Sequence, residues 1–580
     1  MFATDDGSCA TIRFGLFELD TRTGELRKRG VKLKLSDQAY CILRALLNSP
    51  GEVVTREQLK ETVWPDRTFV DFDTVINKSV SQIRTVLGDS GPNPRFIETL
   101  SRRGYRFIAP IAGGRATEPR GTLSIAVLPF ENLTGDAALA YVADGITEAL
   151  TTGLGGLNRV RVISRTSAKA CVAAGKSLAL IGRDLRVNSV VEGSVMAVGQ
   201  VMRVNVRLID IHSERVIWQG RYDSELENLL VLCDRLTQAI AAEINGSPVP
   251  LRVSERPSPV TRAAHLTYLK GRYFWNKRTE KDLYCSIGEF QRALAIDPGF
   301  ALAHTGLADA YVLIGIWGFE ASHSAFRMAR RAAERALELD DGLAEAHTSL
   351  AEVLKDYDWD WPGAESEYRR AISLNPNYST AHHSYAQMLV SLMRYAEAAE
   401  EIELARRVDP LSPAINAYVP YIYLAARDYA RAADEGRRAV ELEPYSPAAR
   451  WQFGRACLFS GDVSQAVTEL ETASNLANRR PMWQAELCFA RARAGDRSGA
   501  AAILSEMTAL ARSSYVSPYD LALCHAGLGH AEAALDHLEH AYKERVMRII
   551  SIGDPELDGL RLEPRFASLV ERLRLPSVDA

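Results

Sequence analysis

Cysteine is sparse in this chain, and no two cysteines stand close enough to form a metal-binding or redox pair. The 580 residues include eight cysteines, and none of them belongs to a CxxC pair. A disulfide-held secreted domain and a zinc ribbon both need cysteines in closely spaced sets. The sequence therefore excludes both classes and favours a reducing compartment.

Long apolar runs are also missing. The first ten residues, MFATDDGSCA, contain no apolar core of a secretory signal. The most apolar stretch, 411–426, is interrupted by Pro413, Asn416 and Pro420, whereas a spanning helix needs about 18 or more apolar residues in a row. We therefore expect a soluble, cytoplasmic protein without a membrane segment.

Neither sign of charge dominates the chain as a whole. There are 69 basic and 73 acidic residues, with a net charge of −4. Residues 12–110 nevertheless hold 17 basic and 12 acidic residues, a net of +5, and the rest of the chain is acidic. A basic module ahead of an acidic body indicates that only the first part meets a polyanion. The excess is modest, so an ordinary surface remains the alternative.

Two segments rich in glycine, proline and arginine divide the chain. They lie at 111–121 and 246–260 and have no periodic apolar positions, which is typical of linkers. The pattern predicts folded parts at 12–110, 122–245 and 261–548, followed by a C-terminal cap at 549–580.

The first part has the pattern of short strands around three helices. Three residues are suited to begin these helices as N-caps: Ser36, Thr55 and Asp73. The third helix is expected over 74–87. Four of its apolar residues are Ile76, Val80, Ile83 and Leu87. They are spaced by four, three and four positions, so they share one side of the helix and form an apolar face.

The opposite face of this third helix is polar and offers groups that can read base edges or contact phosphates. Its candidate DNA-binding residues are Asn77, Lys78, Ser81, Arg84 and Thr85, with Gln82 on the flank. A final hairpin places Arg102 and Arg103 at its tip, where they can reach a minor groove or its phosphates. The arrangement predicts a helix–turn–helix with a basic wing on double-stranded DNA. A merely solvated polar face is the alternative.

Three strings carry a family resemblance: LSDQAYCILRALLNSPGEVVTREQLKETVWPD, TFVDFDTVINKSVSQIRTVLGD and NPRFIETLSRRGYRFIAP. They resemble the winged-helix effector domain of OmpR/PhoB/ToxR-type bacterial regulators. The resemblance implies that 74–87 is the recognition helix and that the wing binds DNA through Arg102, Arg103 and the GYRF segment with Tyr105. Ser101 departs from the arginine or proline of many relatives. This family is linked to phosphorelays, but residues 1–11 cannot hold a receiver domain, so we expect no aspartyl phosphorylation here.

The second part mixes strands and helices, which predicts an α/β sandwich. Its strings SIAVLPFENLTGD, YVADGITEALTTGL and RVNVRLIDIHSERVIWQGRYD resemble the TolB amino-terminal-like domain, which implies an interaction or ligand-sensing module. The segment ACVAAGKS (170–177) approaches a phosphate-binding loop, but it lacks the first glycine and the strand directly before it. We expect instead a surface loop in which Ser177 caps a helix, and we expect no cofactor.

The third part repeats with a period of 34 residues. Alanine recurs at this interval, at Ala364, Ala398, Ala432, Ala466, Ala500 and Ala534. Small residues where helices cross, at this period, indicate tetratricopeptide repeats, and we expect about eight helix pairs. Such arrays bind a protein or peptide on a concave face, although a spacer or dimerisation element is the alternative. Four histidines at 525–540 lack a metal-ligand pattern, so no metal is expected.

Together these patterns predict three fold classes in one chain: an α+β winged helix, an α/β TolB-like sandwich and an all-α tetratricopeptide superhelix. We interpret the chain as a DNA-binding transcriptional regulator and not as an enzyme. Its expected partners are double-stranded DNA and a protein or peptide on the repeats, with RNA polymerase and a dimer on DNA as further candidates. The alternative is a protein-interaction scaffold whose winged helix binds protein.

Overall fold

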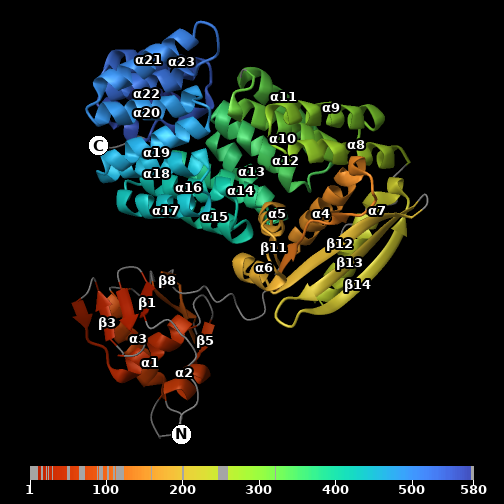
Figure 1. The fold of residues 1–580 in the computed structure, drawn as a ribbon. Coiled ribbons are helices and arrows are strands. Elements are labelled where there is room, and N and C mark those ends of the chain that lie inside the picture. Colours follow the sequence, from red (N-terminus) through yellow and green to blue (C-terminus); the bar gives the residue numbers. More distant parts are fainter. Residues whose placement is uncertain are drawn as a thin grey trace. The chain divides into compact units, whose positions relative to one another are not determined.

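The computed structural model describes most of the chain between residues 11 and 576 (Figure 1). The positions within this range that it leaves out are 15–16, 21–22, 24, 29–30, 49–52, 64–71, 88, 90–95, 101–103, 109–110, 113–122, 158–159, 199–200, 246–258 and 321. The chain folds into two compact units, residues 1–122 and 123–580. The first contains the winged-helix part, and the second contains the middle part together with the repeats.

Within its described residues, the first unit combines two small antiparallel sheets with three helices. One sheet has the strand order β4-β3-β2-β1-β8, formed by β1 (Thr11–Phe14), β2 (Phe17–Asp20), β3 (Glu25–Lys28), β4 (Val31–Leu33) and β8 (Ile111–Ala112). The other has the order β5-β7-β6, formed by β5 (Val53–Thr55), β6 (Ile97–Leu100) and β7 (Gly104–Phe107). The helices are α1 (Asp37–Asn48), α2 (Arg56–Val63) and α3 (Phe72–Leu87). Four phenylalanine rings in mutual contact join the sheets in one core: Phe14, Phe17, Phe96 and Phe107.

Two of the three predicted helix caps are confirmed. The Ser36 hydroxyl accepts a hydrogen bond from the Ala39 amide at the start of α1 (3.3 Å). At α2, Thr55 and Gln58 cap each other, because each side chain accepts the other's backbone N–H. α3 begins at Phe72, so the prediction for Asp73 is wrong: Asp73 lies within the first turn and not at the N-cap.

The middle part is a sheet with helices on both faces (Figure 1). Its strand order is β11-β9-β12-β13-β14, and β10 pairs with β12; the strands are β9 (Leu123–Val127), β10 (Glu131–Asn132), β11 (Val160–Ile163), β12 (Ser189–Val198), β13 (Val201–Asp210) and β14 (Arg215–Ser224). One face packs against α4 (Ala140–Gly155) and α7 (Leu229–Asn245), the other against α5 (Arg165–Ala173) and α6 (Leu178–Leu185). The expected helix cap at Ser177 is confirmed, since its hydroxyl accepts from the Leu180 amide.

The repeats comprise eight successive helix pairs within the described residues. Their helices are α8 (Pro259–Trp275), α9 (Glu280–Ile296), α10 (Ala301–Trp317), α11 (Ser322–Leu339), α12 (Ala344–Val353), α13 (Trp361–Leu374), α14 (Ser379–Ser391), α15 (Tyr395–Val408), α16 (Pro413–Ala425), α17 (Tyr429–Leu442), α18 (Pro447–Ser460), α19 (Val463–Leu476), α20 (Pro481–Arg493), α21 (Arg497–Leu510), α22 (Pro518–Leu528) and α23 (Ala531–Lys543). All six alanines that recur every 34 residues are completely buried. The predicted helix crossings are thereby confirmed.

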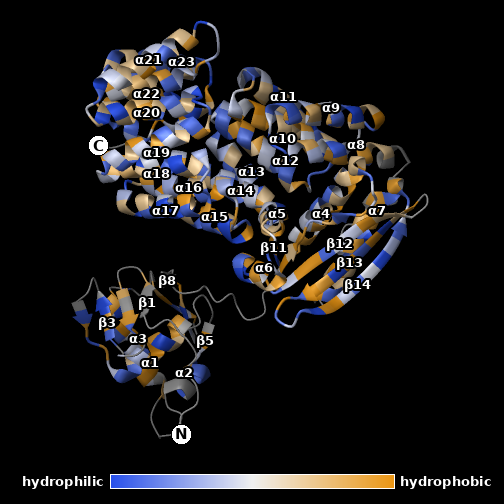
Figure 2. Cartoon of the chain, in the orientation of Figure 1, coloured by the Kyte–Doolittle hydropathy of each residue, from blue (hydrophilic) through white to orange (hydrophobic). Residues whose placement is uncertain are grey.

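None of the helices among the described residues is long and apolar enough to cross a bilayer. Figure 2 shows hydrophilic residues interleaved with hydrophobic ones along the repeat helices, as expected for helices that bury one face and expose the other.

Polar side chains in the turns between repeat helices form hydrogen bonds to the middle part. Asn377, in the turn between α13 and α14, accepts a hydrogen bond from the Val162 amide (3.0 Å) and donates to the carbonyls of Gly155 and Val160 (2.9 Å each). In the turn after α15, Asp409 accepts from the Ser167 hydroxyl (2.5 Å). The two turns thus satisfy hydrogen-bonding groups of the edge strand β11 and of the start of α5 in the sandwich.

An ion-pair network reinforces this contact on α8. Arg272 donates to Glu148 of α4 (2.6 Å) and to Asp309 of α10 (2.9 Å). Asn276 donates to the other oxygen of Glu148 (3.1 Å). One guanidinium thus joins the sandwich to two helix pairs within the second unit.

Beyond α23 the chain folds back on the array. Its elements are η4 (Met547–Ser551), η5 (Pro555–Leu560) and α24 (Pro564–Arg572). Ile549, Leu557 and Phe566 belong to the same apolar core as the repeat helices. The C-terminal segment therefore covers more of the array than the single last face predicted for a cap.

Candidate nucleic-acid interface

α3 divides into a buried face and an exposed face. The predicted apolar stripe is at most 3% exposed at each of its four positions. On the other side Asn77, Lys78, Ser81 and Thr85 are exposed, whereas Gln82 and Arg84 are half-buried. The helix is thus held by its own unit and presents small polar groups and one lysine outward.

Asn77 is fixed by a three-residue hydrogen-bond network. Its Oδ1 accepts from the Tyr105 hydroxyl (2.6 Å) and from Arg56 Nη2 (3.0 Å). Arg56 also donates to the Tyr105 hydroxyl (3.1 Å). The network links α2, α3 and β7, so it sets the orientation of α3 relative to the β6–β7 hairpin. Tyr105 itself is 3% exposed, and its burial suits a positioning role more than the direct DNA contact that the family resemblance implied.

Arg84 points into its own unit. Its Nη2 donates to the Ile97 carbonyl (2.7 Å) and to the Thr99 hydroxyl (2.8 Å). Both partners lie on β6, the first strand of the wing. Arg84 therefore ties α3 to the wing, a role that the helical pattern alone did not indicate.

Two further candidates form hydrogen bonds within the first unit. The Gln82 carbonyl oxygen accepts from the Ser36 hydroxyl at the start of α1 (2.8 Å), and the Thr85 hydroxyl donates to the Ser81 carbonyl (3.0 Å). Gln82 thus fastens α3 to α1. Lys78 and Ser81 are the candidates whose side chains lie on the exposed face without a hydrogen bond to the described residues.

A polar hollow of about 400 Å³ lies between α3 and the wing. Its lining combines groups from α2, α3 and the second sheet: Arg56, Asn77, Val80, Ser81, Arg84, Thr85, Asp89, Thr99 and Tyr105. Asp89 accepts from the Ile97 amide (2.8 Å), so this carboxylate also serves to hold β6. Arg56, Asp89 and Thr99 are the lining residues that the sequence did not single out. For Arg56 the available signal was a cation at the first position of the helix before α3.

The wing tip at 101–103, which includes the predicted Arg102 and Arg103, lies outside the described residues. The strands on either side are in register, with Leu100 opposite Gly104 and Ile97 opposite Phe107. Gly104 has a φ of +153°, and a Cβ there would stand 2.1 Å from the Val54 carbonyl oxygen. Only glycine lets β7 approach β5 this closely.

Replacing Gly104 by alanine should loosen the wing. We expect a loss of about 1–3 kcal/mol of stability in the first unit, because a strained backbone is combined with a backbone clash. Hydrogen exchange measured by mass spectrometry on the full chain should show faster exchange in β5 and β7. Unchanged exchange in both strands would contradict this view of the β5–β7 contact.

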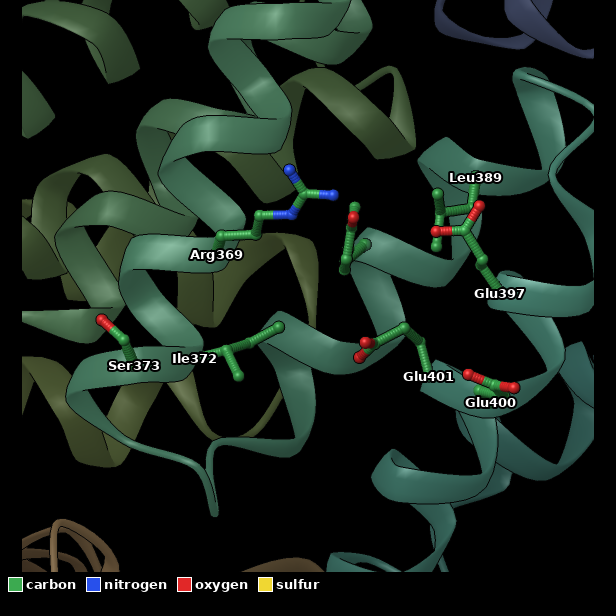
Figure 3. Close-up of a pocket in the computed structure, with 8 residues that line it drawn as sticks. Arg369, Ile372, Ser373, Leu389, Glu397, Glu400 and Glu401 are labelled. Atoms are coloured by element: carbon green, nitrogen blue, oxygen red, sulfur yellow. The ribbon is translucent and has the colours of Figure 1, made fainter. Parts of the chain in front are cut away.

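A second hollow, of about 320 Å³, lies among α13, α14 and α15. Figure 3 shows Arg369 on one side and Glu397, Glu400 and Glu401 on the other. Arg369 pairs with Glu365 (2.6 Å), and Glu401 pairs with His382 (2.6 Å). Arg369 and Glu401 are thus engaged within the repeats, and we assign the hollow no catalytic role.

The histidines near the end of the array lie close together. The His525 ring is 5.6 Å from that of His530 and 5.3 Å from that of His537. Across the part of the chain that the structure describes, no set of three or more histidine, cysteine, aspartate or glutamate side chains is placed to hold a metal ion.

Three family models match this chain. Residues 30–107 match the model of the transcriptional regulatory protein C-terminal domain, residues 121–239 that of the second domain of HilA/YgeH-like transcriptional regulators, and residues 423–486 that of a tetratricopeptide repeat. The chain carries an OmpR/PhoB-type winged helix, a HilA/YgeH-like second domain and tetratricopeptide repeats. The middle part, which resembles the TolB amino-terminal-like domain in sequence, thus has its family match among transcriptional regulators.

Several curated proteins are similar over part of their length. "Transcriptional regulator HilA" of Salmonella typhimurium is 21% identical over 53% of this chain and 55% of its own. "Putative adenylate cyclase 3" of Rhizobium meliloti is 30% identical over 45% of this chain and 44% of its own. "Cholera toxin homolog transcriptional activator" of Vibrio parahaemolyticus is 34% identical over 14% of this chain and 27% of its own. The chain spans about half the length of the first two relatives.

Proposed function

We propose that this chain is a DNA-binding regulator of transcription. The observation that carries the proposal is the division of α3, whose apolar stripe is buried while Asn77, Lys78 and Ser81 remain exposed. A helix anchored in this way can lie in a major groove with its polar face against the base edges. The similarity to proteins named as transcriptional regulators supports the same function.

The residues of the interface divide into contact and positioning groups. Lys78 and Ser81, the amide nitrogen of Asn77 and the Thr85 side chain contact DNA. Gln82, Arg84 and Tyr105 hold α3 against α1 and the wing through the hydrogen bonds described above. Arg102 and Arg103 of the wing contact phosphates or the minor groove, where a cation is favoured.

The second unit receives a partner and passes its presence to transcription. The repeats bind a protein or peptide, as arrays with extended helical faces do. We further propose contact with RNA polymerase, a dimer on DNA and action in the cytoplasm without enzymatic turnover. The cyclase name of one relative is a reason to include nucleoside triphosphates among the compounds tested for turnover.

The first test compares two lysine variants of the full chain on DNA fragments that the wild type captures from its own genome. Lys78→Gln should weaken binding to all sequences. Affinity should also fall less steeply with salt, the slope of log affinity against log salt being smaller in magnitude by about 1, because one phosphate contact is lost. Lys32→Gln removes the same charge from β4, where Lys32 pairs with Glu25, and should leave the slope unchanged.

The outcome also separates the regulator from a scaffold. Equal slopes for the two variants would contradict the assignment of α3 to DNA. Absence of any DNA shift at low salt, together with a protein that copurifies through the first unit, would favour a winged helix that binds protein.

A further inference from the structure

The C-terminal segment lies across the first helices of four consecutive pairs. Tyr421 of α16 donates to Asp554 (2.7 Å), and Tyr519 of α22 donates to the Ser551 carbonyl (3.3 Å). Arg427, just after α16, donates to the Gly553 carbonyl (3.0 Å). Residues 547–560 thus follow the inner face of the array, which we define as the face formed by α16, α18, α20 and α22.

The array offers a buried cation to this segment. Arg455 of α18 donates to both oxygens of Glu556 (2.7 and 2.8 Å) and to Asp554 (2.7 Å). Its guanidinium also lies 5.3 Å from the ring centres of Tyr421 and Trp451. An arginine held between aromatic rings and bound to two carboxylates is a common way to recognise acidic groups.

The segment also contributes a cation, which binds carboxylates of the array. Arg548 donates to Asp520 of α22 (2.8 Å) and to Glu486 of α20 (2.7 Å). Arg455, Glu486 and Asp520 are all at most 3% exposed. The order of charges along the segment, a cation at 548 followed by carboxylates at 554 and 556, therefore complements the order along the inner face.

This contact contains more charged groups than the contacts between neighbouring helices of α16–α23. Neighbouring repeat helices meet mainly through apolar side chains. The contact between the segment and the inner face instead gathers six charged groups, three from each side, of which five are buried and Arg548 is 13% exposed. Burying charges costs desolvation that apolar packing avoids, so a permanent cap would be more stable without them. Charged groups instead confer specificity on a surface that selects its occupant. Burial raises the pKa of Asp554, as expected for carboxylates in excess over arginines.

We propose that residues 547–560 are an internal ligand of the repeats, and that the inner face binds an acidic peptide of a partner protein in their place. The partner's peptide presents two carboxylates two residues apart to Arg455, together with aliphatic anchors. This proposal rests on the proposed function only in that the repeats receive a partner, and it defines the chemistry of that partner.

The test uses the full chain and a fluorescent peptide of residues 545–562. In the chain variant Asp554→Asn/Glu556→Gln, the internal segment is weakened while Arg455 remains. This variant should bind the wild-type peptide at least tenfold more tightly than the wild-type chain does, because its inner face is free. Hydrogen exchange should show that 547–560 lose protection in the variant while α18, α20 and α22 keep it.

Two altered peptides provide the matched comparison. A Glu556→Gln peptide should lose at least tenfold in affinity for the variant chain. An Asp558→Asn peptide should lose less than threefold, since the Asp558 side chain is 40% exposed and its partner Arg427 lies outside the buried cluster.

Two results would overturn the proposal. If α18–α22 lose protection together with 547–560, the segment is part of one cooperative core and not a ligand. If the helices stay protected but the wild-type peptide does not bind, the inner face is not a peptide site. No DNA is present in these assays, so either result would leave the Lys78 test of the first unit unaffected.

Discussion

Replacing Arg272 by methionine should lower the free energy of unfolding of the second unit by about 3 kcal/mol. The variant leaves Glu148 and Asp309 without their shared guanidinium, and removing one partner of a buried ion pair typically costs about 3–5 kcal/mol. The lower end applies because the Glu148 side chain is still 21% exposed. Urea unfolding followed by tryptophan fluorescence would measure the change.

A surface arginine supplies the control for Arg272. Arg292 pairs with Glu289 one helical turn away, and its side chain is 71% exposed. Arg292→Met should cost at most about 0.5 kcal/mol, as exposed pairs contribute little. Equal losses in the two variants would mean that the Arg272 network does not hold the sandwich to the repeats.

The Arg272 effect should depend on pH. Burial works to raise the pKa of Glu148, but Arg272 and Arg165 outweigh it and hold that pKa below its ordinary value of 4.5. A carboxylate whose pKa is lowered by folding adds stability above that ordinary value and loses it as pH falls. Glu148 lacks this stabilising cation in Arg272→Met and is protonated there at a higher pH than in the wild type. The difference in stability between the two proteins should therefore narrow as pH falls and Glu148 takes up its proton.

Arg84→Ala should reduce the DNA affinity of the full chain by about thirty-fold. The variant loses two hydrogen bonds from a charged donor to β6, and about 2 kcal/mol is a reasonable cost for that loss, which corresponds to this factor. If Arg84 positions the wing, affinity for the cognate site and for its single base-pair variants should fall in parallel. If Arg84 reads a base, one of the single base-pair variants should bind Arg84→Ala with the same affinity as the cognate site does.

An exposed arginine on α1 is the control for Arg84. Arg44 is exposed on that helix, and Arg44→Ala removes the same charge from the same unit. We expect less than a twofold change in affinity. A thirty-fold loss in both variants would show that net charge, and not the tie between α3 and the wing, is responsible.

The sequence predicted most of the helices and the buried stripe of α3, because period and capping are local properties of the chain. It could not predict that Arg84 turns toward Ile97 and Thr99, since this depends on how a strand thirteen or more residues away is placed. Gln82 is similar, because its partner Ser36 lies 46 positions earlier. The polar character of these two residues did not indicate whether their side chains point to solvent or toward their own unit.

The organisation of the second unit was also beyond local patterns. Asn377 and Asp409 lie in turns where such residues are common, and nothing in the pattern shows that they complete the hydrogen bonding of the sandwich. The C-terminal segment was predicted as a cap on the last hydrophobic face of the array. Its contacts with Tyr421 and Arg455 come from a long-range match of charges, which can be seen only once the helices are in place.

The network around Asn77 restricts which base this residue can recognise. A carbonyl oxygen has two lone pairs, and both on Asn77 are taken by Tyr105 and Arg56. The paired donor-and-acceptor contact by which asparagine selects adenine needs that oxygen. In the proposed complex with DNA, Asn77 could therefore only donate, and the base opposite it would have to present an acceptor in the major groove, such as guanine O6 or thymine O4.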